Sequence, residues 1–462
     1  MATIIPGRKA CTTNPLKMSA PIGAALAFLG MDRALPLLHG SQGCTAFGLV
    51  LFVRHFRETI PLQTTAMNEV TTILGGLENI EQALLNIKKR ANPALIGICS
   101  TGITEAKGDD VAGFLKLIRD KHPELAGTEV VYTSTPDFVG GFSDGWAKAV
   151  SAMVDALVPP TKVRTPWQVN ILAGCHLTPG DIEEIRETVE AFGLTPIVLP
   201  DLSGSLDGHI PETFLPHTLG GTRLADVKRM GASALTIAIG EQMRPAAALL
   251  EKKAGVPFRV FERLTGLAAC DAFVALLSDL SEQDVPLKYR RQRSQLQDAM
   301  LDGHFYFGEQ KVAIAAEPDL LFALSHFFAD MGATVTCAIA PQDAPVLARV
   351  AAETVRIGDL GDFEEHAAGC DLLVTHSHGR QAAARLGIPF WRAGLPIFDR
   401  LGVAHKVSVG YRGTRDLIFE VGNVFMEQLH AHEQHVTPAS LRPDLHRAGP
   451  APAVDAPARA GH

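Results

Sequence analysis

One cysteine of this chain stands in a setting suited to metal chemistry. Cys44 follows an apolar run, residues 34–38, and a turn bracketed by Gly40 and Gly43, and a helix-like segment begins at once. Backbone N–H groups and the positive end of a helix dipole favour the thiolate, the form of cysteine that binds iron. The glycines let the backbone approach a bulky group. Cys44 is therefore a candidate ligand of a metal or an iron–sulfur cluster; the alternative is a buried structural cysteine.

The other cysteines do not complete such a site. The chain has seven cysteines, and no pair has the Cys-x-x-Cys spacing of zinc or redox centres. They are too sparse for a disulfide framework. Cys99, Cys337 and Cys370 lie in or beside apolar, strand-like runs, where burial is expected, and Cys175 and Cys270 lie near the ends of elements. One cysteine cannot hold a cluster alone, so we expect any iron–sulfur ligands to be shared with another chain.

Charged residues close the helix that Cys44 opens. Arg54, His55 and Arg57 follow one another within a single turn. They either offset the charge of an anionic cluster or partner, or they are favourable cations at a helix C-terminus.

Two further polar segments follow predicted strands. His376 and His378 either bind a metal, for which further ligands are missing, or line a cleft. Asp201 and Asp207, separated by Ser, Gly and Leu, either bind a cation or form a turn network. The three histidines at 430, 432 and 435 are expected at a solvated helix end.

The elements that must position these residues alternate between strand and helix. Short apolar runs bounded by turn residues predict buried parallel strands at residues 34–38, 94–99, 129–132, 168–173, 196–199, 234–239, 258–261, 311–316, 333–339 and 371–375. Helical patterns lie between them. Asp109 is the expected N-cap of the helix over 111–120, and Thr178 with Asp181 resembles a capping box.

This alternation predicts an α/β fold made of three Rossmann-like, doubly wound parallel-sheet domains. We expect the domains to span residues 1–160, 161–305 and 306–436, followed by a disordered Pro- and Ala-rich tail at 437–462. Ligands of such folds bind beyond the carboxyl ends of strands, here the loops after Cys99, Leu199, Ile239 and Thr375. The chain has no G-x-G-x-x-G fingerprint and no phosphate-binding P-loop, so the topology does not imply NAD or ATP.

Composition excludes several classes of function. The chain has 462 residues, of which 47% are hydrophobic and 20% charged, enough for a large packed core. Its net charge of −8 argues against a nucleic-acid surface. The first ten residues hold no apolar signal core, and no apolar run approaches the ~20 residues of a membrane span. We therefore expect a soluble cytoplasmic protein.

Taken together, these segments resemble the nitrogenase component 1 family over residues 10–430. Each block alone is a weak signal, but the ordered set is highly specific. The matching blocks are Asn14-Pro15-Leu16-Lys17, His39-Gly40-Ser41-Gln42-Gly43-Cys44, Arg54-His55-Phe56-Arg57-Glu58, Ser100-Thr101 to Glu105 with Gly108-Asp109-Asp110, residues 135–140 with Gly145-Trp146, and residues 392–400.

Within this family the chain looks like the beta-type chains. The catalytic beta subunit places three cysteines on the P-cluster, and its motifs align them with Ser19, Cys44 and Gly102 here. Only Cys44 is retained, which is the pattern of the branch that assembles the nitrogenase cofactor. Residues 200–208 and 375–380 are also more similar to that branch.

The resemblance implies a scaffold that matures the precursor of the iron–molybdenum cofactor. It implies an alpha-type partner chain in an α2β2 heterotetramer and a [4Fe–4S] cluster held by three partner cysteines and Cys44. The molybdenum-free precursor would be held mainly by the partner. The nitrogenase iron protein, the precursor donor and apo-nitrogenase would bind transiently. No catalytic residue is assigned to this chain, because the chemistry would belong to the heteromer.

Two other functions remain open at this point. The chain resembles, as an alternative, a catalytic beta-type subunit of a nitrogenase or of a nitrogenase-like reductase such as light-independent protochlorophyllide reductase. The loss of two thiolates weakens this alternative, because an eight-iron cluster needs them. A cluster-free structural subunit, with Cys44 as a relic, is the third reading.

Overall fold

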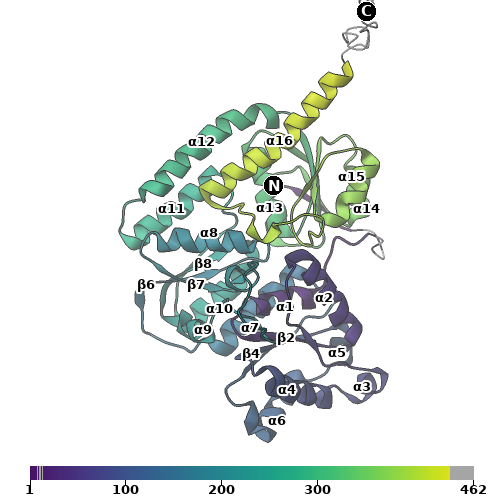
Figure 1. The fold of residues 1–462 in the computed structure, drawn as a ribbon, viewed down its shortest axis with the longest axis vertical. Helices are drawn as coiled ribbons and strands as arrows, with labels where there is room; N and C mark the ends of the chain where they lie inside the picture. The colour runs from purple at the N-terminus through teal and green to yellow at the C-terminus, as the bar shows by residue number, and fades with distance from the viewer. Residues whose placement is uncertain (8, 10–11, 13, 437–462) are drawn as a thin grey trace, which may run out of the picture.

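The computed structural model describes residues 1–7, 9, 12 and 14–436. The predicted tail at 437–462 and Cys11 lie outside the described residues. In the described part the strands form three sheets, and every strand pair within them is parallel. Helices pack around these sheets (Figure 1). The predicted α/β class with three parallel sheets is therefore confirmed.

The first two sheets have four strands each. The first has the order β3-β2-β4-β5, with β2 at Ala34–His39, β3 at Gln63–Thr64, β4 at Leu95–Ser100 and β5 at Glu129–Thr133. The second has the order β7-β6-β8-β9, with β6 at Thr165–Leu172, β7 at Thr195–Leu199, β8 at Ser233–Ile239 and β9 at Phe258–Phe261. In each sheet the second strand is added on one side of the first (β3 beside β2, β7 beside β6), and the next strands are added on its other side. Where the strand order reverses in this way, a crevice forms at the carboxyl ends of the strands.

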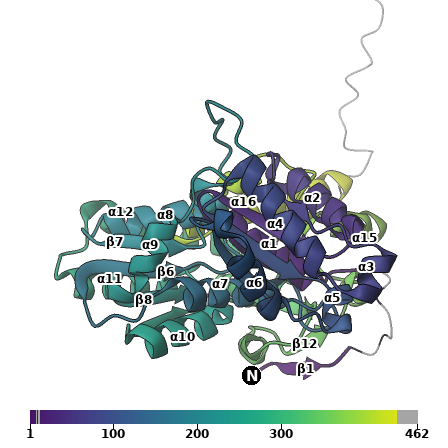
Figure 2. The ribbon, with the colours of Figure 1, turned by 90° about the horizontal axis from the view of Figure 1, so that it is seen from below.

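The third sheet contains the first strand of the chain. Its six strands have the order β1-β12-β11-β10-β13-β14, and β1 lies beside β12 (Figure 2). Thr3 of β1 pairs with Thr354 of β12. The domain boundaries at 160 and 305 stay a prediction. The bounds are β1 Thr3–Ile5, β10 Lys311–Ala315, β11 Thr334–Ala340, β12 Thr354–Ile357, β13 Leu372–Thr375 and β14 Phe390–Arg392.

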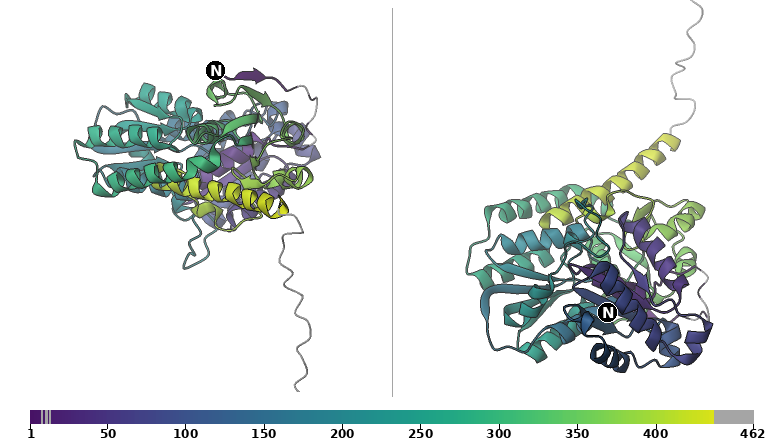
Figure 3. Two further views of the ribbon diagram at one scale, coloured as in Figure 1. Left: turned by 90° about the horizontal axis from the view of Figure 1, so that it is seen from above. Right: turned by 60° about the horizontal axis from the view of Figure 1, so that its bottom comes forward.

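Sixteen α-helices connect the strands in the described residues. The last one, α16, packs against α12 and so returns from the third sheet toward the second (Figures 1 and 3). The bounds are α1 Ala20–Leu29, α2 Gln42–Phe56, α3 Glu69–Leu74, α4 Leu77–Ala91, α5 Gly102–Lys107, α6 Val111–Lys121, α7 Phe142–Leu157, α8 Pro179–Glu190, α9 Leu224–Arg229, α10 Arg244–Ala254, α11 Leu267–Ser281, α12 Leu287–Phe307, α13 Pro318–Asp330, α14 Leu360–His366, α15 Arg380–Leu386 and α16 Gly410–Val436.

Of the two helix N-caps that the sequence predicted, one is confirmed and one is displaced by a residue. The Thr178 hydroxyl accepts from the Asp181 N–H and the Asp181 carboxylate accepts from the Thr178 N–H, both at 3.0 Å, which confirms the capping box. The predicted N-cap of α6 was wrong by one residue. Asp110 caps that helix through the Gly113 N–H at 3.0 Å, whereas Asp109 faces the buried ring of His39.

One close helix contact joins the first two sheets. All ten residues of α1 are buried, and α1 crosses α7 where Gly23 and Gly145 lie against backbone carbonyls of the opposite helix. A Cβ at either position would overlap those carbonyls, so glycine is required there. From α7, the Trp146 indole N–H donates to the Ala173 carbonyl at 2.9 Å, just beyond β6. No helix in the described part of the chain is long and apolar enough to cross a bilayer.

Candidate functional site

Cys44 lies at the N-terminal end of α2, as the sequence predicts. The strand β2 ends at His39, Ser41 occupies the N-cap, and Cys44 is the third helical residue. Its side chain is exposed. The Ser41 Oγ lies 3.6 Å from the Cys44 Sγ and makes no capping hydrogen bond to the helix backbone.

Cys44 opens onto a cavity of about 550 Å³. Ser19 and Asp137 also line this cavity, and Asp137 accepts a hydrogen bond from the Gly102 N–H at 3.1 Å. Ser19 and Cys44, two of the three positions that the family resemblance aligns with cluster ligands, thus line one cavity, and the third, Gly102, is bonded to its lining residue Asp137. The opposite wall is formed by the third sheet and the segment after it, through His376, His378, Arg380 and Phe398 among others.

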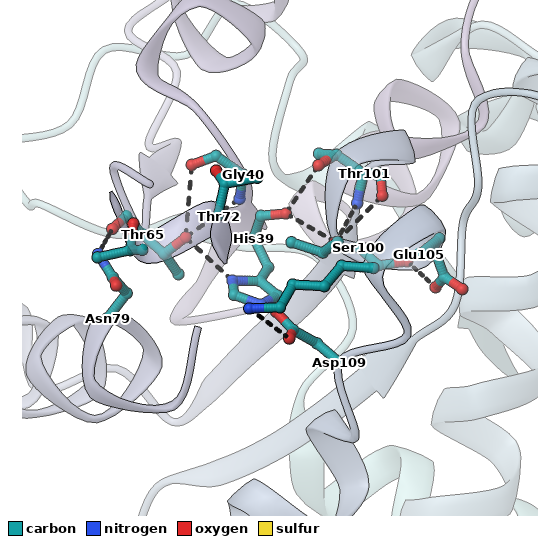
Figure 4. Close-up of polar contacts among 12 residues, drawn as sticks. His39, Gly40, Thr65, Thr72, Asn79, Ser100, Thr101, Glu105 and Asp109 are labelled. Atoms are coloured by element: carbon teal, nitrogen blue, oxygen red, sulfur yellow. Dashed lines mark hydrogen bonds and ion pairs between the residues drawn. The ribbon is translucent and has the colours of Figure 1, made fainter. Parts of the chain in front are cut away.

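A buried polar network holds the turn that carries Cys44 (Figure 4). The His39 Nδ1 lies 3.0 Å from the Thr65 hydroxyl oxygen, which also accepts from the Gly40 N–H at 3.1 Å. The Thr101 hydroxyl donates to the His39 carbonyl at 2.9 Å. A Cβ at Gly40 would overlap Thr101, so this position requires glycine.

Burial and hydrogen bonds shift the pKa values of two ionisable side chains in this network, His39 and Glu105. Burial lowers the pKa of His39, although Asp109 lies 3.4 Å from its Nε2 and favours the protonated form. Burial also opposes ionisation of Glu105, but hydrogen bonds from Ser100, Ser134 and Tyr132 outweigh it and hold the pKa of that carboxyl below its usual range. The ends of β4 and β5 are thus tied together beside the cavity.

His376 and His378 lie on the cavity wall. Burial lowers the pKa of His376 to about 3, so its ring is neutral, and the two imidazole centroids are 5.3 Å apart. Among the described residues, no group of three or more His, Cys, Asp and Glu side chains has the arrangement of a metal site. The cleft-lining interpretation therefore accounts for this pair better than a metal site does.

The charged residues at the end of α2 bind the segment after β14. The His55 Nδ1 accepts from the Ile397 N–H at 2.9 Å, the Arg54 guanidinium lies 4.1 Å from the centroid of the Phe398 ring, and Arg57 donates to the Phe398 carbonyl at 3.1 Å. Burial lowers the pKa of His55 to about 4, so it acts as a neutral acceptor. These contacts hold the C-terminal end of α2 in place. Arg54 and Arg57 also keep their positive charges there, which a ligand could use.

The two aspartates after β7 are part of a turn network. Asp201 accepts from the backbone N–H and the hydroxyl of Ser203, at 3.1 and 2.6 Å, and pairs with Arg186. Asp207 lies 2.5 Å from the Nδ1 of His209. Because both carboxylates already have partners, the turn interpretation holds over cation binding.

The other described cysteines are less accessible than Cys44. Cys99, Cys270, Cys337 and Cys370 are buried, as the strand patterns predicted for three of them, and Cys175 is partly buried. Burial raises the pKa of the Cys99 thiol, which keeps it protonated. A [4Fe–4S] cluster needs four protein ligands, usually thiolates, and the described residues that line this cavity offer one. This donor set would suit one corner of such a cluster only where another chain supplied the remaining ligands.

Several residues of this site were not predicted. Ser41 precedes Cys44 by three residues, and nothing in the sequence indicated that it is the N-cap of α2 or that its hydroxyl lies beside the sulfur. Lys17 and Arg380 line the cavity, and neither has a carboxylate within ion-pair distance in the described part of the chain. Only the tertiary fold brings residues so distant in sequence to one cavity.

Known proteins are similar to this chain over most of its length. The family model described as nitrogenase component 1 type oxidoreductase matches residues 19–426. The chain is 60% identical over 429 residues to the nitrogenase iron-molybdenum cofactor biosynthesis protein NifN of Bradyrhizobium diazoefficiens, covering 92% of both chains. It is 53% identical to NifN of Rhodobacter capsulatus, covering 93% of this chain and 94% of that protein. Among solved structures, "Nitrogenase Cp1 at pH 6.5" is similar, with 33% identity, a TM-score of 0.87 and coverage of 92% and 96%.

Proposed function

The chain belongs to the nitrogenase component 1 type oxidoreductase family, and from this premise we propose that it is the beta-type subunit of a scaffold that matures the iron–molybdenum cofactor of nitrogenase. Relatives that cover more than nine-tenths of the chain are named as biosynthesis proteins of that cofactor. The observation that carries the proposal is the cavity of Cys44. It keeps one thiol where Ser19 and Gly102 occupy the other aligned positions.

In this proposal Cys44 supplies one ligand of a [4Fe–4S] cluster that is shared with a NifE-like alpha-type chain. The position supports this role, because Cys44 is exposed and a Cβ added at Gly43 would meet no atom within 4 Å. On the outer face of α2, Phe47 is 72% exposed and Val50 is 55% exposed. Exposed apolar side chains beside a polar site are typical of a protein–protein interface.

The charges of the cavity also suit an anionic group. Lys17 and Arg380 line it, and neither is paired with a carboxylate among the described residues. A cluster with four thiolate ligands carries net negative charge, and uncompensated cations nearby stabilise it. Asp137 and Glu364 are the acidic residues of the lining. The Asp137 carboxylate accepts from the Gly102 N–H, and Glu364 pairs with Arg385.

A shared cluster would make assembly and cluster binding depend on each other. A ligand that binds only the associated state stabilises that state. When bound, the cluster supplies a one-electron relay; this chain holds and orients it through Cys44. The precursor cluster would be held mainly by the partner in an α2β2 heterotetramer. The iron protein, the precursor donor and apo-nitrogenase would bind in turn.

The alternative is a catalytic beta-type subunit, and the similarity to a solved nitrogenase chain favours it on fold alone. It predicts substrate reduction by the purified heteromer in the presence of the iron protein. The serine and glycine at the aligned ligand positions argue against it, because an eight-iron cluster would lose two thiolates here.

The test is anaerobic co-expression with a NifE-like partner, followed by iron quantitation and EPR. Cys44→Ala should lose one [4Fe–4S] signal per αβ pair. Cys99→Ala is the matched control, because that thiol is buried in β4, and it should keep full iron. Full iron and unchanged EPR signals in Cys44→Ala would contradict the shared-cluster proposal.

A further inference from the structure

The N-cap serine of α2 does not cap its helix. An N-cap serine hydroxyl normally accepts a hydrogen bond from the N–H of the second or third helical residue. Thr178 and Asp110 do this in α8 and α6, each at 3.0 Å. Ser41 has the extended backbone of an N-cap, with φ −76° and ψ 157°, but its side chain makes no such bond. Its hydroxyl is therefore available for another partner.

That partner is the sulfur of Cys44. The Ser41 Oγ lies 3.6 Å from the Cys44 Sγ, within hydrogen-bond range for sulfur. A thiolate has no proton to donate, so in the metal-binding form of Cys44 the serine hydroxyl must be the donor and the sulfur the acceptor.

A second feature of the cavity, independent of α2, points to a bound group. His376 belongs to the segment after β13, lines the same cavity and is only 5% exposed. Its Nδ1 has no hydrogen-bond partner among the described residues. A buried polar atom without a partner is costly, so such atoms indicate a ligand or water that completes the site.

We propose that the Ser41 hydroxyl donates a hydrogen bond to the Cys44 thiolate and thereby raises the reduction potential of the cluster that Cys44 holds. This inference rests on the proposed function. A hydrogen bond to a ligating sulfur withdraws electron density and favours the reduced, more negative cluster. Ser41 is thus a tuning residue that acts through Cys44, and cluster binding itself does not require it.

The experiment is a redox titration monitored by EPR on the heteromer purified with its NifE-like partner. Ser41→Gly removes the hydroxyl, and glycine is well tolerated at an N-cap. Ser41→Thr keeps a hydroxyl. We expect full iron in both variants, a more negative midpoint potential in Ser41→Gly, and a value near that of the wild type in Ser41→Thr.

The outcomes separate this inference from the proposed function. An unchanged potential in Ser41→Gly, with full iron, would overturn the tuning role and leave the shared cluster intact. Loss of iron in Ser41→Gly would also overturn it, because the hydroxyl would then be needed for binding. Full iron and unchanged EPR signals in Cys44→Ala would instead contradict the shared cluster of the proposed function.

Discussion

The imidazole of His55 and the backbone of Ile397 are joined by a hydrogen bond of 2.9 Å across 342 positions of the sequence. The N–H of Ile397 is the donor and the neutral His55 Nδ1 is the acceptor. This bond attaches the C-terminal end of α2 to the segment after the third sheet. Because Cys44 opens the same helix, the two sides of its cavity are held in one arrangement.

The His55 contact should make stability depend on pH. Burial lowers the pKa of His55 from 6.5 to about 4, so the unfolded chain binds more protons between these values. The contribution of neutral His55 to the free energy of unfolding is therefore complete above pH 6.5. This contribution, about 3 kcal/mol, is lost as the pH falls through 4. His55→Asn keeps an acceptor and cannot titrate. Its free energy of unfolding should fall less than that of the wild type from pH 6.5 to 4; parallel profiles would refute the assignment.

Two glycines of the Cys44 turn should respond oppositely to alanine. Gly40→Ala places a methyl group against Thr101 and should lower the free energy of unfolding by about 1–3 kcal/mol. Gly43→Ala meets open space and removes a helical glycine, so the isolated chain should be stabilised by up to about 1 kcal/mol. If a partner and cluster fill that space, Gly43→Ala should nevertheless co-purify with less iron. Thermal unfolding and iron assays measure both, and unchanged iron would mean that the space stays empty.

The pair formed by Arg392 and Asp399 should contribute strongly to stability. The Arg392 guanidinium lies 2.8 Å from the Asp399 carboxylate, and both side chains are mostly buried. Burial opposes ionisation of Asp399, but Arg392 and Ser377 hold its pKa at about 2. Asp399→Asn leaves a buried cation unpaired and should cost about 3 kcal/mol at pH 7.

The control for that pair is Asp155→Asn, which breaks the exposed contact with Lys253 and should cost less than about 1 kcal/mol. Chemical denaturation measures both variants. The stabilisation by Asp399 should be complete above its unfolded pKa of 3.8 and be lost as pH falls through 2. Equal effects of the two substitutions would show that burial of the Arg392 pair is unimportant.

Glu317 should destabilise the folded chain as the pH rises from 4.5 to 7 and above. Burial raises its pKa from 4.5 to about 7, and its Oε2 has no hydrogen-bond partner in the described part of the chain. A raised pKa gives a contribution that is complete below pH 4.5 and is lost as pH rises through 7. Glu317→Gln should therefore become more stable relative to the wild type by about 3 kcal/mol between pH 4 and 8. The exposed Glu365→Gln should show no such trend in denaturant titrations.

The strands that have a local apolar pattern in the sequence were predicted. Residues 94–99, 196–199 and 371–375 are short apolar runs between turn residues, and each lies within one residue of an observed strand. The strands β1, β3, β12 and β14 were not predicted. They have two to four residues each, and their pairing with longer neighbours, rather than a local pattern, makes them strands.

The residues of the candidate site also fall into those that a local sequence pattern predicts and those that it does not. Cys44 was found because glycine spacing, an apolar run and a helix start occur together in a few residues. The cavity wall opposite Cys44 was predicted only in part. His376 was expected to line a cleft, but the sequence did not indicate that Cys44 lines the same one. The distance between two sheets is set by long-range packing, such as the His55 contact with Ile397, and no local pattern encodes it.

The pairing of β1 with β12 constrains how the chain is made as well as how it is held. Thr3 is synthesised before Thr354, its neighbour in the sheet, which follows about 350 residues later. At typical rates of synthesis this delay is about 20–70 s. During that time the edge strand has no partner, while the first two sheets can already fold. The third sheet is therefore completed by a strand that is synthesised before either of the other two sheets, and a bulky group fused ahead of Thr3 should delay its closure.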